Sequence, residues 1–448
     1  MFIQMIDNVH ILGGGPAGMA SAYYAHQNNI KYALYEGSSA IGGNCKTIEF
    51  GGFRYDTGAH RFHDKNPAVT HLIKDLLGDE LQKVSSPSKI FWNGKFIDFP
   101  INAIDILCKM GFSKNIKILG ENIFNQLKGG KEAVNFQDLA YNSYGKTLAD
   151  LFLINYTEKL WGCKANQLSS NIAGGRLKNL DIKSVLKGLF SSESVKHLDG
   201  SFLYPKYGFG QIFTSLLDKL DSESIVLNSK VLNLIHDGKF IKNIVFKDGK
   251  TIGVDKSDVV ISTLPMPLLL KGMYPRIPDE ISNLIDSLKY RNLRLFVLFL
   301  NKNKLTDNAS IYFPQEDIPF TRIYEPKNRS EYMAPSGKTC IVVELPYDSE
   351  LSLSEIEYTA EDIISFLQDN SLLQNNEVID SQIIDIPYAY PIITSSLNNE
   401  LYKMHKFLNS FSNLQIIGRS ADFKYSHVHD LFDRAQNIIN EIILDNND

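Results

Sequence analysis

Residues 9–20 read VHILGGGPAGMA, an apolar strand that runs into a glycine-rich turn and then into a helix expected to reach about Gln27. In such a turn Gly13 permits the sharp bend, Gly15 lets a pyrophosphate approach the backbone, and Gly18 allows the helix to pack closely on the strand. The free N–H groups and the dipole of the helix N-terminus favour the negative charge of that pyrophosphate. The stretch therefore predicts a dinucleotide-binding unit.

The second strand of this unit ends in an acidic residue. Residues 31–36 read KYALYE, which places Glu36 about 20 residues past the glycines, the distance expected for an acid that bonds the ribose hydroxyls. A glycine-rich turn followed by an unrelated surface glutamate is the alternative. The order of strand, turn, helix, strand and acid favours the dinucleotide site.

Two further runs indicate which dinucleotide binds. Residues 37–44 read GSSAIGGN and residues 51–60 read GGFRYDTGAH, and a Rossmann unit that binds only NAD needs neither run. Together they resemble the FAD-binding flavoprotein superfamily of amine oxidases, protoporphyrinogen oxidases and UDP-galactopyranose mutases. The resemblance implies that FAD is the cofactor, that Gly42 and Gly43 line its ribityl-phosphate side, and that the turn ending at His60 lies against the isoalloxazine.

The last part of the chain indicates which branch of this superfamily the sequence resembles. Residues 418–430 read GRSADFKYSHVHD and look like the C-terminal flavin motif of UDP-galactopyranose mutases, not the acidic, small-residue motif of amine oxidases. A helix N-terminus near Val428 and His429 can stabilise negative charge on the reduced flavin. Arg419 can add a fixed cation, with a surface salt bridge as the alternative. No cysteine or histidine stands here in the setting used for covalent attachment, so FAD is expected to bind non-covalently. The residues expected to bind FAD are Gly13, Gly15, Gly18, Glu36, Gly42, Gly43, Asn44, Gly58, His60, Val231, Gly418, Arg419, Val428 and His429.

Four shorter segments resemble the substrate site of the mutases. They are YTEKLWG at 156–162, PFTRIYE at 319–325, VELP at 343–346 and PYAYP at 387–391. The resemblance implies that Trp161 packs on the substrate, and that Arg322 and a tyrosine hold a diphosphate, whose oxygens match the fork of an arginine. The expected substrate-binding residues are Trp161, Arg176, Arg322, Glu344, Tyr388 and Tyr390.

These residues also have structural interpretations. Trp161 can be a core aromatic, and either tyrosine can be ordinary strand packing. Glu344 lies between apolar residues, where an unpaired carboxylate would be costly, so it is expected to pair with an arginine. Two departures from the mutase pattern concern the sugar: Arg176 lies about one residue out of register, and no acid follows the Tyr-Pro stretch.

Composition limits the class of protein. The 448 residues are enough for two or three domains, and 44% hydrophobic with 11% aromatic content is ordinary for a soluble protein. The net charge of −5 does not favour a nucleic-acid partner. Cys45, Cys108, Cys163 and Cys340 share no metal-ligand or CxxC spacing, so no metal site is expected. The cysteine pattern, the lack of a leader and the short apolar runs predict a cytoplasmic protein without a membrane span.

An α/β fold is expected, with a discontinuous Rossmann-type FAD-binding domain. This domain, glutathione reductase-like with two βαβ halves, should comprise residues 1–84, 204–265 and 405–448. Residues 85–203 read as mostly helical and should form an inserted domain that covers the flavin. Residues 266–404 should form a substrate domain built on a mixed sheet.

Apolar periodicity places the main elements within this scheme. A helix is expected at 66–81, and an Asn-Gly turn predicts a hairpin at 88–100. The apolar run at 258–263 should return to the parallel sheet, and 413–418 should be its last buried strand. A helix at 428–444 should close the chain.

The resemblance implies an isomerase of surface-polysaccharide biosynthesis. In it the N5 of reduced flavin acts as nucleophile on the anomeric carbon of a UDP- or dTDP-linked sugar, so the active flavin is reduced, with NAD(P)H as a candidate reductant. The expected catalytic residues are His60, Arg176 and Arg322. The alternative is an oxidoreductase of the amine oxidase or protoporphyrinogen oxidase kind with flavin as hydride acceptor, and a flavin-binding protein without catalysis is a third interpretation. The sequence does not indicate an oligomeric state.

Overall fold

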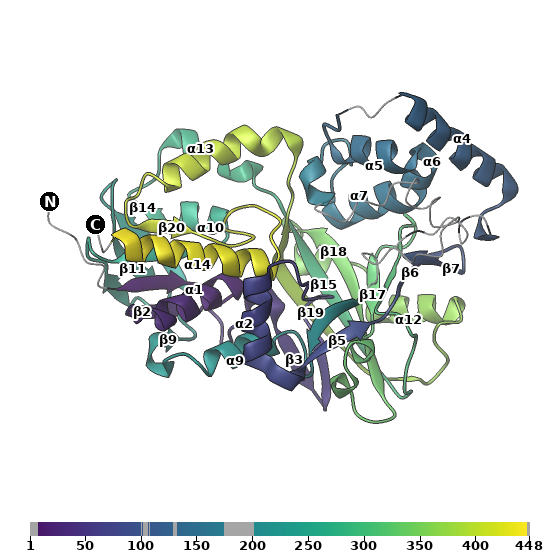
Figure 1. Ribbon diagram of the computed structural model, residues 1–448, viewed down its shortest axis with the longest axis horizontal. Helices are drawn as coiled ribbons and strands as arrows, with labels where there is room; N and C mark the ends of the chain where they lie inside the picture. Colours follow the sequence, from purple (N-terminus) through teal and green to yellow (C-terminus); the bar gives the residue numbers. More distant parts are fainter. Residues whose placement is uncertain are drawn as a thin grey trace.

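A five-stranded parallel sheet forms one part of the molecule (Figure 1). Its order is β20-β13-β1-β2-β9, with β1 at Val9–Leu12, β2 at Tyr32–Tyr35, β9 at Ile225–Val226, β13 at Val259–Ser262 and β20 at Leu414–Ile416. The predicted strands therefore form and pair in parallel, and the predicted α/β class is confirmed. The computed structural model describes residues 8–99, 101, 106, 108–128, 132–173 and 201–445.

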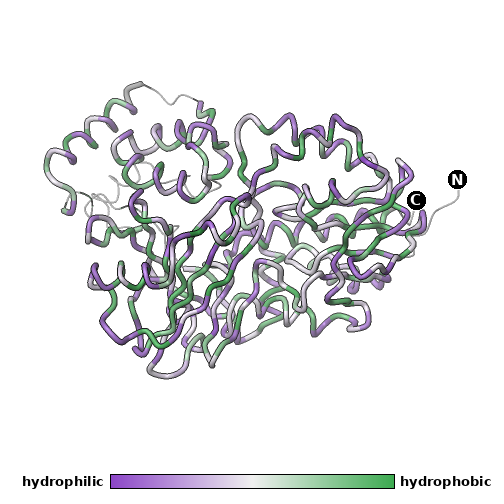
Figure 2. Tube along the Cα trace, turned by 180° about the vertical axis from the view of Figure 1, so that it is seen from behind, coloured by the Kyte–Doolittle hydropathy of each residue, from purple (hydrophilic) through white to green (hydrophobic). Residues whose placement is uncertain are grey.

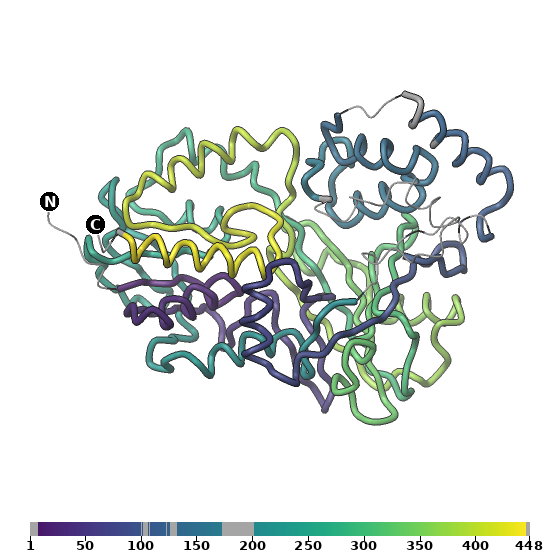
Figure 3. Tube along the Cα trace, in the orientation of Figure 1, coloured from purple at the N-terminus to yellow at the C-terminus, as the bar shows by residue number. Residues whose placement is uncertain are grey.

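Helices cover both faces of this sheet. On one face α1 (Pro16–Gln27) packs beside α14 (Val428–Asp445), so the first and last helices lie side by side, as the purple and yellow segments of Figure 3 show. On the other face α10 (Met266–Lys271) and α13 (Asn398–Leu408) share a core with β1 and β13. Burial of both faces explains why the strands are almost entirely apolar.

The predicted helix at 66–81 is also present. The α-helix α2 spans Pro67–Leu77, and a short 3₁₀ turn continues it through Gly78–Glu80. The side chain of Asn66 accepts hydrogen bonds from the first helical amides, and a proline fills the first position, so the sequence itself fixes the start of the helix.

A mixed seven-stranded sheet forms the second part, in the order β19-β15-β18-β17-β16-β6-β7. The predicted Asn-Gly hairpin is confirmed as β6 and β7, and β6 pairs in parallel with β16 at the edge of this sheet. The hairpin thus belongs to the sheet and not to the helical segment that follows it. The strands are β6 (Ser88–Trp92), β7 (Lys95–Phe99), β15 (Tyr290–Leu300), β16 (Ser310–Tyr312), β17 (Arg322–Tyr324), β18 (Thr339–Asp348) and β19 (Val378–Pro391).

Helices α4 to α7 form a lobe beside the hairpin (Figure 1). They are α4 (Phe112–Lys128), α5 (Phe136–Tyr144), α6 (Lys146–Ala149) and α7 (Asn155–Trp161), with a π-helical turn at Asp150–Ile154 before α7. Ile90 and Ile97 of the hairpin share a core with Phe136, Phe152 and Trp161, so the lobe is packed onto the sheet. Hydrophobic residues also recur along α4 (Figure 2).

Smaller elements complete the fold. A four-stranded sheet has the order β12-β11-β10-β14, and β3 with β4 and β5 with β8 form two separate strand pairs. No helix within the described ranges given above is long and apolar enough to cross a membrane. The remaining bounds are β3 (Thr47–Phe50), β4 (Phe53–Asp56), β5 (Leu81–Ser85), β8 (Ser201–Pro205), β10 (Val231–His236), β11 (Ile241–Phe246), β12 (Thr251–Gly253), β14 (Met273–Tyr274), α9 (Gln211–Leu217), α11 (Asp279–Ser282) and α12 (Ala360–Asp369).

Candidate active site

The glycine turn after β1 has the shape that a pyrophosphate requires. Gly13 has φ +105°, and a Cβ on Gly18 would overlap the carbonyl oxygen of Gly13, so neither position accepts a side chain. A Cβ on Gly15, in contrast, would meet only Gly43 Cα at 3.8 Å, which leaves open space beside the turn. Helix α1 starts here without a side-chain cap. The free amides and the open space fit a bound phosphate group.

Glu36 lies at the carboxyl end of β2, next to this turn. Its carboxylate accepts hydrogen bonds from the backbone N–H of Gly14 at 2.7 Å, and from the N–H and hydroxyl of Ser38 at 2.8 and 2.7 Å. A carboxylate has about four acceptor sites, so one of them is left for a ribose hydroxyl. The backbone N–H of Ser229 donates to the carbonyl of Glu36 at 2.8 Å, which places the chain just before Val231, the first residue of β10, next to the end of β2.

The second glycine run folds onto the first. The N–H of Gly42 donates to the carbonyl of Gly14 at 2.7 Å, and a Cβ on Gly43 would lie 2.9 Å from Gly15 Cα. The carbonyl of Asn44 then accepts a hydrogen bond from His60 Nε2 at 2.9 Å. The structure therefore brings together the predicted flavin residues of three separate segments.

His60 is held in one tautomer by this contact. A carbonyl oxygen only accepts, so Nε2 carries the proton and Nδ1 of a neutral ring is left as an acceptor. Burial, and after it the positive charge of Arg419, lowers the pKa of His60 to about 3. The imidazole is consequently uncharged at neutral pH.

Three contacts fix the backbone of the turn that carries His60. Arg329 Nη1 donates to the carbonyl of His60 at 2.8 Å, the N–H of Ala59 donates to Glu344 Oε1 at 3.1 Å, and the hydroxyl of Tyr324 donates to the carbonyl of Asp56 at 2.6 Å. All three partners come from the segment 322–344. The seven-stranded sheet therefore positions the turn expected to face the isoalloxazine.

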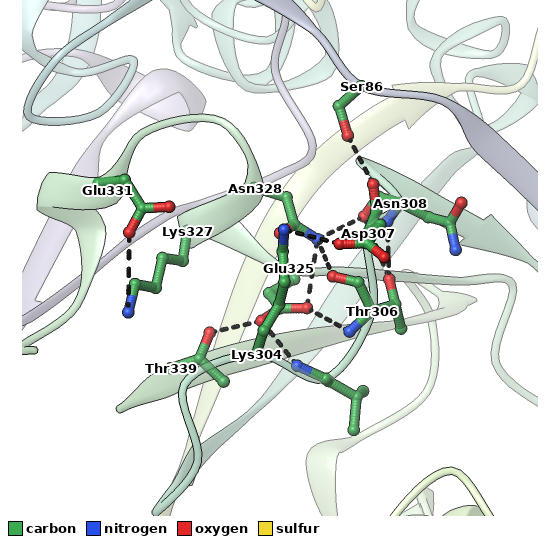
Figure 4. A network of polar contacts seen from close by, with 11 residues as sticks. Ser86, Lys304, Thr306, Asp307, Asn308, Glu325, Lys327, Asn328, Glu331 and Thr339 are labelled. Atoms are coloured by element: carbon green, nitrogen blue, oxygen red, sulfur yellow. Dashed lines mark hydrogen bonds and ion pairs between the residues drawn. The ribbon is translucent and has the colours of Figure 1, made fainter. Parts of the chain in front are cut away.

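Arg329 was not among the residues predicted for the site. Its side chain is buried, and its Nε has no hydrogen-bond partner. A short 3₁₀ helix, Pro326–Asn328, precedes Arg329 and is anchored through Glu325. The carboxylate of Glu325 accepts hydrogen bonds from the amides of residues 305 and 306 and from the side chains of Asn328 and Thr339 (Figure 4). Only the tertiary structure shows that this anchored segment reaches His60.

Arg322 and Glu344 form a buried ion pair across β17 and β18. Arg322 Nε lies 2.8 Å from Glu344 Oε2, and Nη2 lies 2.8 and 2.6 Å from the two carboxylate oxygens. The expected pairing of Glu344 with an arginine is confirmed; its side chain is 1% exposed. Burial alone would lower the pKa of Arg322, but Glu344 outweighs this and leaves that pKa raised. Within the described ranges no residue accepts a hydrogen bond from Nη1 of Arg322.

An aromatic cluster lies beside this pair. The ring of Trp161, from α7, lies 5.7 Å from that of Tyr390 and 5.9 Å from that of Tyr425. Arg419 lies 4.7 Å above Tyr425, and donates to the carbonyl of Ser426 at 3.0 and 3.2 Å; it takes part in no ion pair within the described part of the chain. Burial raises the pKa of Tyr390 to about 12, so its hydroxyl stays protonated and is a donor.

The two tyrosines predicted to bind the substrate lie in different surroundings. Tyr388 has φ +53°, its N–H donates to Asn292 Oδ1 at 3.0 Å, and its ring packs on Tyr290 at 5.1 Å. The pairing of β19 with β15 shifts register at this point, which turns Tyr388 away from Tyr390. Tyr390 joins the aromatic cluster and Tyr388 does not. Arg176 lies outside the described residues.

The C-terminal segment returns to the dinucleotide turn. A Cβ on Gly418 would lie 3.7 Å from the carbonyl oxygen of Thr263, the residue that packs on Gly13. Helix α14 starts at Val428, and the N–H of His427 donates to Asp430 at 2.8 Å. His429 is buried, which lowers its pKa. In the parts of the chain described here, no group of three or more His, Cys, Asp or Glu side chains could hold a metal ion.

Comparison with known proteins identifies the family. Residues 16–365 match the sequence profile of the family described as flavin containing amine oxidoreductase. The chain belongs to this family. It is therefore a flavoprotein, and the predicted cofactor, FAD, is confirmed.

Relatives of two kinds are similar to the chain. The dTDP-fucopyranose mutase of Escherichia coli is 21% identical over 431 residues, which cover 94% of each chain. Protoporphyrinogen oxidase 2 of Arabidopsis thaliana is 23% identical over 257 residues, so the chain spans about half the length of that relative. Among solved structures, reduced UDP-galactopyranose mutase has a TM-score of 0.85 at 21% identity, covering 98% of this chain and 95% of that one. A putative protoporphyrinogen oxidase from Exiguobacterium sp. 255-15 has a TM-score of 0.76 at 15% identity, covering 98% and 99%.

Proposed function

We propose that the protein is a FAD-dependent nucleotide-sugar mutase, which interconverts the pyranose and furanose forms of a UDP- or dTDP-linked sugar for surface-polysaccharide biosynthesis. The observation that carries the proposal is the convergence of the Arg322–Glu344 pair, Tyr390, Trp161 and Arg419 near the turn of His60. Fixed donors beside aromatic rings are what a diphosphate joined to a sugar and a base requires. The match to dTDP-fucopyranose mutase over nearly the whole of both chains supports this choice.

The domain scheme follows from the same proposal. We assign the five-stranded parallel sheet, with α1, α9 and α14, to a Rossmann-type FAD domain of two βαβ halves, drawn from the three segments 1–84, 204–265 and 405–448. Helix α10 and most of α13, which cover the other face of this sheet, lie outside these bounds. The glycine turn lies at the carboxyl ends of the strands, where ligands of open α/β sheets bind. The helical lobe is then the insertion, and the seven-stranded sheet carries the substrate side.

In this proposal the chain's own residues bind and orient the substrate. Nη1 of Arg322 and the hydroxyl of Tyr390 donate to the diphosphate, and Glu344 holds Arg322 in place while it also fixes the turn of His60. Trp161 packs on the substrate, and Arg176 supplies a second cation. Reduced FAD, when bound, supplies the nucleophile for the anomeric carbon.

The second candidate is an oxidoreductase in which the flavin accepts a hydride. It is favoured by the family description and by the similarity to protoporphyrinogen oxidase over half the chain. An oxidoreductase acting on a neutral or cationic substrate has no use for a free donor on Arg322. Because an arginine also binds carboxylates, the donor alone does not choose, and the match to dTDP-fucopyranose mutase over nearly the whole of both chains favours the mutase.

A panel of nucleotide sugars tests the proposal. The protein, reduced with dithionite or NAD(P)H, is incubated with UDP- and dTDP-linked pyranoses, and the products are separated by chromatography. New furanose peaks that appear only with reduced flavin support the mutase. Reduction of the flavin by a substrate, with no isomer formed, would support the oxidoreductase instead.

A further inference from the structure

Lys159 lies just before Trp161 in α7, and its side chain is partly buried. Its ammonium group donates hydrogen bonds to the backbone carbonyls of Phe313, Gln315 and Ile318 at 2.6, 2.8 and 2.6 Å. A lysine has three N–H donors and no acceptor, so these three carbonyls use all of them. Lys159 therefore has no donor left for a ligand and acts only through the segments that it connects.

The three carbonyls belong to the loop between β16 and β17. Tyr312 is the last residue of β16 and Arg322 is the first residue of β17, and the guanidinium carbon of Arg322 lies 6.0 Å from the ring centre of Tyr312. Inside the loop, Phe313 and Phe320 are fully buried and pack on each other at 4.8 Å. Carbonyl oxygens that point toward one place repel each other unless a donor lies between them. The ammonium group of Lys159 is that donor, so a side chain of the helical lobe shapes the loop that leads into Arg322.

The backbone of Lys159 is held as well. Its carbonyl accepts a hydrogen bond from Arg291 Nη2 at 3.3 Å, and the same nitrogen donates to the carbonyl of Pro346 in β18 at 3.1 Å. Arg291 also forms an ion pair with Asp348 of β18. The last turn of α7, which carries Trp161, is thus joined to β18 through its backbone and to the β16–β17 loop through the side chain of Lys159.

We propose that Lys159 is a positioning residue of the substrate site. It holds the helix that carries Trp161 against the loop that leads into Arg322, and it thereby fixes the distance between the aromatic cluster and the diphosphate donor. An ammonium group suits this task because it is compact and directs three donors around one point, whereas an arginine offers a flat fork. The inference rests on the proposed function, in which Trp161 and Arg322 bind one nucleotide sugar.

Calorimetric titration of the flavin-bound protein with UDP and dTDP tests the inference. Burial lowers the pKa of Lys159 to about 7, although the carboxylates of Asp317 and Glu316 act in the opposite direction, so the titrations are made at about pH 6, where the group is charged. Lys159→Met keeps most of the side-chain length and removes the three donors. We expect it to raise both dissociation constants roughly tenfold or more, because binding groups displaced by about 1 Å no longer meet the ligand together.

Two further variants serve as the comparison. Lys159→Arg keeps the charge but not the arrangement of donors, so it should recover only part of the affinity. The matched control is Lys164→Met, which removes an exposed lysine of the same segment that pairs with Glu158 at 2.8 Å and should bind both nucleotides like the natural protein. An unchanged flavin spectrum shows that each variant is folded.

A double-mutant cycle with Trp161→Phe separates positioning from a general loss of stability. If Lys159 acts through the placement of Trp161, Lys159→Met should weaken nucleotide binding less in the Trp161→Phe background than in the natural protein. A general loss of stability would weaken binding by the same factor in both backgrounds. Hydrogen–deuterium exchange of residues 313–321, measured without nucleotide, should become faster in Lys159→Met and stay the same in Lys164→Met.

Three results would overturn the inference and leave the proposed function intact. They are a Lys159→Met variant that binds the nucleotides as tightly as the natural protein, equal effects in the two backgrounds of the cycle, and unchanged exchange in the loop. A natural protein that binds neither UDP nor dTDP would overturn the proposed function, and this inference with it.

Discussion

Replacement of Arg322 by alanine tests the structural role of this side chain. In the folded protein Arg322 makes three hydrogen bonds of 2.6–2.8 Å to Glu344, which is almost fully buried. Removal of one partner of a buried pair costs about 3–5 kcal/mol because the other charge is left unpaired. Arg322→Ala should therefore lower the free energy of unfolding by about this amount.

A double variant isolates the effect on the ligand. Arg322→Met with Glu344→Gln removes both charges and nearly keeps both volumes, and the glutamine oxygen can still accept from the N–H of Ala59. Stability should return close to that of the natural protein. Loss of one charge-assisted hydrogen bond to the diphosphate, about 1.5–3 kcal/mol, should still raise the dissociation constant for UDP or dTDP roughly 10- to 150-fold.

Calorimetric titration with UDP and dTDP, together with chemical denaturation, measures both quantities. The flavin spectrum should be the same in all three proteins. A double variant that binds the nucleotides as tightly as the natural protein would refute the role of Arg322. If the natural protein binds neither nucleotide, the nucleotide-sugar proposal is wrong.

Three other changes test the flavin site. Gly15→Val should fold, because the position has an ordinary φ of −74° and open space, yet purify colourless because the side chain occupies the pyrophosphate position; full flavin occupancy would contradict this. Arg329→Met removes the hydrogen bond to the carbonyl of His60 and should speed flavin loss on dilution, measured by flavin fluorescence. The matched control is Lys327→Met, which removes a buried cation that donates hydrogen bonds to residues 303 and 338 and should not speed this loss. Equal loss in both variants would assign Arg329 a general structural role. The folded-state pKa of His60 lies below the ordinary 6.5, so stability should fall as the pH is lowered from about 6.5 toward 3, and His60→Gln should flatten that slope; an unchanged slope would show that His60 is not the group responsible.

Local patterns predicted the parts of the fold that depend on neighbouring residues. Three examples are the glycine spacing at 13–18, the Asn-Gly hairpin and the cap of α2. In each, the backbone conformation is set by residues only a few positions apart in the chain. The pairing of Glu344 was predictable for a similar reason, since its apolar neighbours in β18 require burial and burial requires a counter-charge.

Contacts between distant segments were not predictable in this way. No local signal shows that β6 pairs with β16, because that register is set by the whole seven-stranded sheet. The bulge that separates Tyr388 from Tyr390 depends on a register shift against β15, and alternation alone would have kept them together. Arg329 reaches His60 only because the Glu325 network folds its segment under the turn.

The electron balance of a turnover tests the central claim most directly. The FAD of the protein is reduced once without oxygen, and dTDP-fucopyranose or UDP-galactopyranose is added in large excess while the flavin spectrum and the sugar products are followed. A mutase should form many equivalents of the furanose per flavin while the flavin stays reduced. No furanose, or one equivalent of product for each flavin that changes oxidation state, would contradict the claim.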